Sequence, residues 1–337
     1  MSTAIQYWSG KRVFVTGGTG FLGRWLVAEL VGRGAAPTLL VRESFRPTNL
    51  LNANSLSELP IVTGSVESYD SLLGALLERR PDVVFHLAGQ SLTGEAKKFP
   101  LQTLETNVRG TWNLLEACRQ SSVPQIVVAS SDKVYASTAE LPYRETHPLM
   151  GDSPYAVSKG CADLICRMYA STYGLRVAMA RFPIIFGGGD PNFSRLIPDV
   201  VRTTLAGQRF VINSDGKSGR DFVYVHDAVL ALMTLAERLD SEPSLAGEAF
   251  NFSLEIRVTV LEMVRTVAKL MSASHLVPIV KGDASVESRD SYMCCEKARQ
   301  LLDWTPRWEL EEALKETISW YQHNSGVEAH NAVEVLD

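Results

Sequence analysis

Tyr155 and Lys159 lie four residues apart in the segment YAVSK, a spacing that suits proton transfer. On an α-helix, residues four apart share one face, so the ammonium group of Lys159 can lie near the phenol of Tyr155. A nearby positive charge lowers the pKa of a phenol and favours the phenolate. Beside a nicotinamide, a phenolate can take the proton of a substrate alcohol as hydride leaves. The pair therefore predicts oxidation or reduction at an alcohol carbon, if a dinucleotide binds nearby.

The loop TGGTGFLG, which follows the apolar segment RVFVTG, predicts that dinucleotide site. Its glycines have the spacing GxxGxxG, which lets the backbone turn tightly and approach a pyrophosphate that the next helix N-terminus stabilises. A tight strand-to-helix turn without a ligand is the alternative. We expect the cofactor to contact Gly17, Thr19, Gly20, Phe21, Leu22, Gly23, Arg42, Ser65, Val66, Leu87, Ala88, Tyr155 and Lys159.

The end of the second predicted strand bears on the choice between NAD and NADP. An acidic residue at the strand end would bind the ribose 2′-hydroxyl group, but Arg42 stands there, with Arg46 close in sequence. An arginine suits a 2′-phosphate, so Arg42 favours NADP. A solvated surface arginine is the alternative.

Asp132 and Lys133 are adjacent charged residues directly after the apolar segment QIVVASS (125–131). A charged pair at the end of a buried strand is costly unless the chain opens into a cleft there. We therefore expect a cleft at this point. A salt bridge on the surface after the strand is the alternative.

These residues are positioned by a chain in which short apolar strands alternate with helical segments. The expected strands are 12–17, 37–42, 60–64, 82–89, 125–131 and 176–182, and a long helix is expected over 153–173. Continuous apolar strands between helices predict an α/β fold, a Rossmann-type doubly wound parallel sheet with a smaller, interleaved C-terminal substrate lobe. We expect a dinucleotide domain of 1–181 with 222–257, a substrate lobe of 182–221 with 258–325, and a tail of 326–337.

Composition excludes several classes of protein. The net charge of −5 provides no positive field for nucleic acid or for an anionic membrane. No apolar run reaches the roughly 18 residues of a membrane-spanning helix, and the N-terminus lacks the apolar core of a signal peptide. The five cysteines show no CxxC pair and no histidine at metal-ligand spacing. We therefore expect a reduced cytoplasmic protein with no metal.

Six motifs, in this order along the chain, resemble the extended short-chain dehydrogenase/reductase superfamily in its epimerase/dehydratase branch, which acts on sugar nucleotides. They are GTGFLG, VVFHLAGQ, TNVRGTWNLLEAC, SSDKVY, YAVSK and GRDFVYVHD, and the likeness extends over nearly all of 11–322. The Ser-Asp-Lys sequence is most similar to 4,6-dehydratases that act on cytidine-linked sugars. The resemblance thus implies an NDP-hexose, and CDP-glucose in particular, as substrate, with NAD(P)+ retained and recycled. The resemblance to the dehydratases favours NAD, whereas Arg42 favours NADP.

The resemblance implies distinct catalytic roles for the residues around position 132. Ser131 would hydrogen-bond the reacting sugar hydroxyl group. After oxidation at C4 makes the C5 proton acidic, Asp132 would protonate the leaving C6 hydroxyl group and Lys133 would take the C5 proton. Tyr155 and Lys159 would act in the oxidation at C4, and hydride would return to C6.

Further residues are assigned to the substrate and to an interface. We expect Arg195, Arg220 and Arg289 to bind the diphosphate, because guanidinium groups match phosphate oxygens. The resemblance supports Arg220, whereas for Arg195 and Arg289 ordinary surface arginines are the alternative. The resemblance places Asn107 near the active site, and Gln90 follows the fourth strand. His86 is interpreted as structural. Helices over 99–120 and 153–173 would form a four-helix homodimer interface.

Two observations leave other reactions open. Cytidine-linked dehydratases typically have His where Gly18 stands, and the family usually has Asn where Ile184 stands. The alternatives are a 4-epimerase or an NADPH-dependent 4-keto sugar reductase. From another class, the alternative is a dinucleotide-binding protein without catalytic activity.

Overall fold

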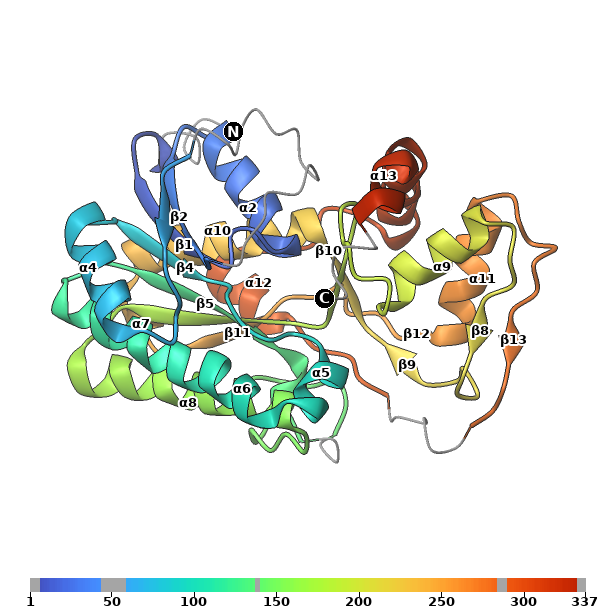
Figure 1. The fold of residues 1–337 in the computed structure, drawn as a ribbon. Helices are drawn as coiled ribbons and strands as arrows, with labels where there is room; N and C mark the ends of the chain where they lie inside the picture. Colours follow the sequence, from blue (N-terminus) through green and yellow to red (C-terminus); the bar gives the residue numbers. More distant parts are fainter. Residues whose placement is uncertain (1–6, 44–58, 137–139, 284–289, 332–337) are drawn as a thin grey trace.

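The structure is a computed structural model that describes residues 7–43, 59–136, 140–283 and 290–331, with side chains up to residue 324. A large layered domain and a smaller lobe lie beside each other (Figure 1). Among the described residues, no helix combines the length and the apolar character needed to cross a membrane.

The large domain is built on a parallel sheet of seven strands in the order β11-β6-β5-β4-β1-β2-β3. The strands are β1 (Arg12–Thr16), β2 (Ala36–Val41), β3 (Ile61–Thr63), β4 (Val83–His86), β5 (Ile126–Ser131), β6 (Val177–Phe182) and β11 (Ala249–Asn251). The chain starts at β1, extends to one edge through β3, and then returns to β4 on the other side of β1. Loops that leave β1 and β4 diverge at this switch point, where ligands of such sheets bind. The predicted Rossmann-type fold is confirmed.

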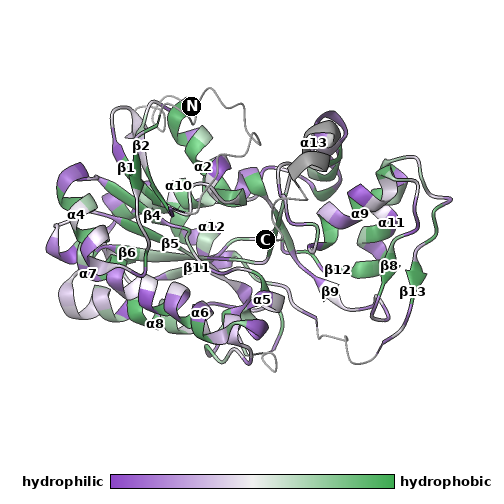
Figure 2. Cartoon of the chain, viewed as in Figure 1, coloured by the Kyte–Doolittle hydropathy of each residue, from purple (hydrophilic) through white to green (hydrophobic). Residues whose placement is uncertain are grey.

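Helices cover both faces of the sheet, which explains why its strands are apolar throughout. One face packs against α2 (Phe21–Gly32), α10 (Val225–Ser241) and α12 (Glu296–Leu302). The other packs against α4 (Tyr69–Arg79), α7 (Gly110–Gln120) and α8 (Pro154–Tyr173). Figure 2 shows the strands largely hydrophobic, whereas the outer helices mix hydrophobic and hydrophilic residues.

The smaller lobe has its own apolar core. It contains α9 (Leu196–Leu205), α11 (Val260–Leu270), α13 (Leu310–Asn331), and the strand pairs β7 (Ile184–Phe186) with β10 (Phe222–Tyr224), β8 (Val211–Ile212) with β13 (Ile279–Val280), and β9 (Gly219–Arg220) with β12 (Val258–Thr259). Because α10 and β11 return to the large domain between these elements, the lobe is interleaved with the sheet. The exact domain boundaries given above stay a prediction.

Short elements complete the described chain. They are α5 (Thr93–Lys98), α6 (Pro100–Leu104), a π-helical turn η1 (Glu105–Arg109), and the 3₁₀ turns η2 (Asp132–Val134) and η3 (Pro243–Leu245). The elements α5, α6 and η1 follow β4, and η2 follows β5. These four therefore lie at the carboxyl end of the sheet, whereas η3 precedes β11.

Candidate functional site

Helix α8 places Tyr155 and Lys159 at the carboxyl end of β5. The helix starts sharply because the Ser153 side chain accepts a hydrogen bond from the Ala156 amide and Pro154 occupies the first turn. Lys159 Nζ donates to the Ala129 carbonyl oxygen of β5 at 2.9 Å, which anchors the helix face to the sheet.

The electrostatics of this pair follow from burial. Burial raises the pKa of Tyr155 to about 12, and the negative charge of Asp132 adds to the rise. A hydrogen bond with Ser131 and the positive charge of Arg195 lower the Tyr155 pKa. Burial also lowers the pKa of Lys159, which the Asp163 carboxylate opposes. Without ligands, the phenol therefore holds its proton at neutral pH.

Asp132 is buried at the carboxyl end of β5, with only 7% of its surface exposed. Its Oδ1 accepts a hydrogen bond from Ser131 Oγ at 3.0 Å, and its Oδ2 accepts one from Ser291 Oγ at 2.6 Å. Lys133 Nζ is 3.5 Å from Oδ2, and its side chain is 43% exposed. Asp132 and Lys133 form an ion pair. Lys133 lies at the surface, as the alternative of a surface salt bridge requires, but the carboxyl group of Asp132 is buried.

Ser291 is a site residue that the sequence analysis missed. It lies 159 positions after Asp132, in the segment between β13 and α12 that is bridged to β9 of the smaller lobe, and no motif around it signals contact with β5. Only the packing of the lobe against the sheet brings the two residues together.

The glycine loop has the shape that a pyrophosphate requires. Gly17 has φ +72°, and a Cβ atom there would lie 2.6 Å from the Ala88 amide nitrogen. A Cβ atom at Gly23 would lie 2.1 Å from the Gly17 carbonyl oxygen. Helix α2 begins directly after Gly20 and has no acidic residue in its first turn, so its N-terminus is free to stabilise an anion. These residues fit a dinucleotide.

Gly18 is also restricted by its neighbours. A Cβ atom there would approach Leu39 Cδ2 to 2.8 Å. A side chain at this position requires only the end of the Leu39 side chain to shift, so the structure does not explain why glycine stands there.

Other predicted cofactor residues lie at the same carboxyl end of the parallel strands. Leu87 N donates to the Thr16 carbonyl oxygen at 3.0 Å and Ala88 N to Thr16 Oγ1 at 3.3 Å, which holds the end of β4 against β1. Ser65 and Val66 directly follow the loop after β3. Arg42 follows β2 and is exposed, whereas Arg46 lies outside the described residues.

The Asn107 side chain makes its hydrogen bonds to other residues of the chain. Its Oδ1 accepts from the Gln90 amide at 2.7 Å, while its Nδ2 donates to the Gln90 carbonyl oxygen at 3.0 Å and to Ser158 Oγ at 2.8 Å. The π-helical turn η1 presents this side chain to both partners. Asn107 therefore fixes the loop after β4 against α8, and Gln90 is the predicted substrate residue that it positions.

The predicted diphosphate ligands Arg195 and Arg220 come from the smaller lobe. Arg195 Nη1 binds Asp190 Oδ2 at 2.9 Å, and its Nη2 donates to Ser91 Oγ at 3.1 Å across to the large domain. Arg220 Nη1 donates to the Gly219 carbonyl oxygen at 2.7 Å. Arg289 lies outside the described residues.

His86 fits a structural role. It is buried at the end of β4, with Nδ1 2.7 Å from Thr16 Oγ1 and Nε2 3.2 Å from Thr111 Oγ1. Burial lowers the pKa of His86 to about 3, so the ring is neutral. It joins β1, β4 and α7.

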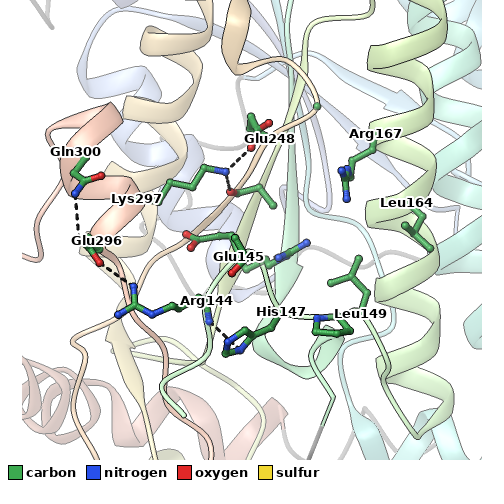
Figure 3. A pocket seen from close by; sticks show the side chains of 15 residues that line it. Arg144, Glu145, His147, Leu149, Leu164, Arg167, Glu248, Glu296, Lys297 and Gln300 are labelled. Atoms are coloured by element: carbon green, nitrogen blue, oxygen red, sulfur yellow. Dashed lines mark hydrogen bonds and ion pairs between the residues drawn. The ribbon is translucent and has the colours of Figure 1, made fainter. Parts of the chain in front are cut away.

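A separate hollow of about 840 Å³ opens beside the edge strand β11. Figure 3 shows α8 on one side of it and α12 on the other. Glu145 Oε1 accepts from the Asn251 amide at 2.8 Å, and Lys297 Nζ donates to the Ala249 carbonyl oxygen at 2.8 Å. These charged groups satisfy the outward backbone of the edge strand. The hollow is not lined by any of the predicted catalytic residues.

Two further groups bear on chemistry. Within the described ranges, no cluster of three or more His, Cys, Asp or Glu residues is placed to hold a metal ion. The cysteines at 118, 161, 166, 294 and 295 are all free thiols.

Known proteins resemble this chain over most of its length. A model described as "NAD dependent epimerase/dehydratase family" matches residues 13–252. The CDP-glucose 4,6-dehydratase of Salmonella typhimurium is 32% identical, covering 94% of this chain and 92% of its own. The UDP-glucose 4-epimerase of Mycolicibacterium smegmatis is 29% identical, and the match covers 93% of this chain and 99% of the epimerase.

Solved structures agree with this likeness. The dTDP-glucose 4,6-dehydratase of Streptomyces venezuelae with NAD bound has a TM-score of 0.83 at 26% identity, covering 94% of this chain and 98% of its own. The UDP-glucose 4-epimerase of Thermotoga maritima with UDP-glucose has a TM-score of 0.84 at 26% identity, covering 93% and 99%.

Proposed function

The chain belongs to the NAD-dependent epimerase/dehydratase family, and on this premise we propose that it is a nucleotide-sugar 4,6-dehydratase with CDP-glucose as substrate. The observation that carries the proposal is the enclosed Asp132 carboxyl group, paired with Lys133 and adjoining Ser131 and Tyr155. Oxidation at C4 needs no such acid and base pair, whereas elimination of water needs both. The similarity to a CDP-glucose 4,6-dehydratase supports the choice of substrate.

The first step is assigned to Tyr155, Ser131 and Lys159. Ser131 orients the C4 hydroxyl group, and Tyr155 takes its proton. Lys159, which the Ala129 carbonyl oxygen holds on the same helix face, is assigned to orient the cofactor beside Tyr155. Bound NAD(P) supplies the hydride acceptor for C4 and later the hydride donor for C6.

The second step is assigned to Asp132 and Lys133. Transfer of the Lys133 proton to Asp132 within the ion pair leaves Lys133 as the base and Asp132 as the acid. The C4 ketone makes the C5 proton acidic, and Lys133 removes it. The C6–O bond breaks as a C5–C6 double bond forms, and the hydroxyl group leaves as water with the proton of Asp132. When hydride reaches C6, Lys133 returns its proton to C5. The proton that Tyr155 took from the C4 hydroxyl group then restores Asp132, so the net change is loss of one water, which gives a 4-keto-6-deoxy sugar.

The test is incubation with a panel of CDP-, GDP-, UDP- and dTDP-hexoses, read by mass spectrometry. The expected result is loss of one water from CDP-glucose without net consumption of cofactor. Isomerised sugar without mass loss would instead identify a 4-epimerase, the second candidate, which the similarity to 4-epimerases favours. Oxidation of NADPH by a 4-keto sugar would identify a reductase. Cofactor binding without any turnover would identify a silent dinucleotide-binding protein.

The cofactor itself gives a separate prediction. If the exposed Arg42 binds a 2′-phosphate, Arg42→Ala weakens NADP binding by about tenfold, the order of one charge-assisted hydrogen bond, and leaves NAD binding unchanged. Titration calorimetry with both dinucleotides measures the change. Equal affinities in wild type and variant would show that Arg42 is a solvated residue and that the enzyme uses NAD.

We also propose a homodimer through α7 and α8. These helices expose large apolar side chains, among them Trp112 on α7 and Leu164 and Met168 on α8. Leu164→Glu is expected to convert the dimer to monomers, because it places a charge in an apolar interface. Analytical ultracentrifugation measures the mass, with Leu77→Glu on α4 as control, since Leu77 is 51% exposed and Leu164 53%. A wild-type monomer would refute the dimer.

The proposed setting is the cytoplasm. The free thiols suit a reducing compartment, and a small-molecule nucleotide sugar is the proposed partner.

A further inference from the structure

We propose that Ser291 is the positioning residue of the elimination step, because it holds the carboxyl group of Asp132 from the opposite lobe. The contact is short and enclosed. Ser291 Oγ lies 2.6 Å from Asp132 Oδ2, and both residues are buried. Ser131 Oγ contacts the other oxygen, Oδ1, at 3.0 Å. Each carboxyl oxygen therefore has one hydroxyl partner, and the plane of the carboxyl group is fixed.

The backbone of Ser291 is held on both sides by the smaller lobe. The Ser291 amide donates to the Gly219 carbonyl oxygen at 3.1 Å, and the Gly219 amide donates to Asp290 Oδ1 at 2.7 Å. Two positions on, the Met293 amide donates to Asp221 Oδ2 at 2.9 Å. These bonds hold the Ser291 backbone in place, and the short serine side chain then places its hydroxyl group at Asp132.

The segment is also tied to the chain that precedes α8. The Tyr143 amide donates to the Tyr292 carbonyl oxygen, and the Cys294 amide donates to the Tyr143 carbonyl oxygen, both at 2.9 Å. Ser291 thus lies in an extended segment whose isolated β-bridges reach both the smaller lobe, at Arg220, and the large domain, at Tyr143. This one residue links Asp132 to Arg220, which is predicted to bind the substrate.

A hydroxyl group suits this position chemically. It can donate to a carboxylate and can accept from a protonated carboxyl group. The same contact therefore persists before and after Asp132 releases its proton to the leaving hydroxyl group. The other partner of Oδ2, Lys133 Nζ, is farther away at 3.5 Å and has to move a proton of its own. Ser291 alone among the contacts of Oδ2 takes no part in the proposed proton transfers.

The inference rests on the proposed dehydratase function, and the test separates the two. Wild-type enzyme is first shown to remove water from CDP-glucose. Ser291→Ala is then followed in single turnovers by the absorbance of reduced nicotinamide and by sugar mass. We expect C4 oxidation at the wild-type rate and water loss slowed by about 10- to 100-fold, the range for a hydrogen bond to a charged group, so reduced cofactor accumulates. Ser291→Thr, which keeps the hydroxyl group, is expected to restore water loss.

A double-mutant cycle excludes a merely structural effect. In an Asp132→Asn background, Ser291→Ala is expected to cause no further loss, because both changes act on one group. Thr317→Val is the control, since Thr317 is also buried and its hydroxyl group donates to the Ala313 carbonyl oxygen within α13, away from Asp132 and from the segment that carries Ser291. In this control variant, the ratio of the oxidation rate to the elimination rate is expected to equal that of wild type.

Three outcomes would overturn the inference. They are equal slowing of both steps in Ser291→Ala, additive losses in the double variant, and accumulation of reduced cofactor in Thr317→Val. If wild-type enzyme removes no water, the proposed function fails first, and the role given to Ser291 falls with it.

Discussion

Asp132→Asn is expected to stop water elimination while oxidation at C4 continues. Asparagine keeps the shape of the side chain and its contact with Ser291, but it has no acidic proton for the leaving hydroxyl group. Loss of a general acid costs about 10²- to 10⁴-fold. Mass spectrometry of the sugar nucleotide measures the elimination, and the absorbance of reduced nicotinamide measures the oxidation.

Lys133→Met tests the base of the same step. The expected loss of elimination is again about 10²- to 10⁴-fold, because the C5 proton has no acceptor in the variant. The exchange of C5 hydrogen with deuterated water separates the two roles. Asp132→Asn is expected to retain exchange at C5, and Lys133→Met is expected to lose it.

The chain contains a matched control for this pair. Asp215 and Lys217 also form an ion pair close in sequence, at 3.8 Å, but Lys217 is 83% exposed in the smaller lobe. Asp215→Asn and Lys217→Met are expected to leave both steps unchanged. Full activity of Asp132→Asn and Lys133→Met would show that the pair at the end of β5 is a substrate contact or a salt bridge, and the 4-epimerase would replace the dehydratase.

Tyr155→Phe is expected to block the first step. Phenylalanine cannot take the proton of the C4 hydroxyl group, so the rate of cofactor reduction falls by about 10²- to 10⁴-fold. Dinucleotide affinity is expected to stay close to that of wild type, because the glycine loop is untouched. Tyr169→Phe is the control on the same helix, since its hydroxyl group contacts Glu116, 3.2 Å away on α7.

The pH dependence of this step follows from the burial of Tyr155. Because burial raises its pKa to about 12, the phenol is protonated at neutral pH and the reactive phenolate fraction grows as pH rises. In wild type, single-turnover cofactor reduction is therefore expected to speed up from neutral to alkaline pH. The residual rate of Tyr155→Phe is expected to lack this rise. A wild-type rate that is flat with pH would assign the base to another group.

The sequence by itself determined the features that depend on local spacing. Alternating apolar strands and helices predicted the parallel sheet, because each strand buried on both faces must be apolar. The glycines of the loop were read from the spacing GxxGxxG, and the close approach of Gly17 to Ala88 shows why no larger residue fits. Tyr155 and Lys159 share a face because helix geometry alone puts residues four apart on one side.

Only the tertiary structure decided which side chains from distant parts of the chain meet at the site. The sequence placed Asp132 after a buried strand, but it could not supply Ser291, whose contact depends on how the smaller lobe packs against the sheet. Arg195 was predicted from its chemistry as a phosphate ligand, and the fold adds its partners Asp190 and Ser91. Backbone geometry sets the spacing of residues that are a few positions apart. The contacts of Asp132 with Ser291 and of Arg195 with Ser91 join segments far apart in sequence, and the packing of the two cores brings these segments together.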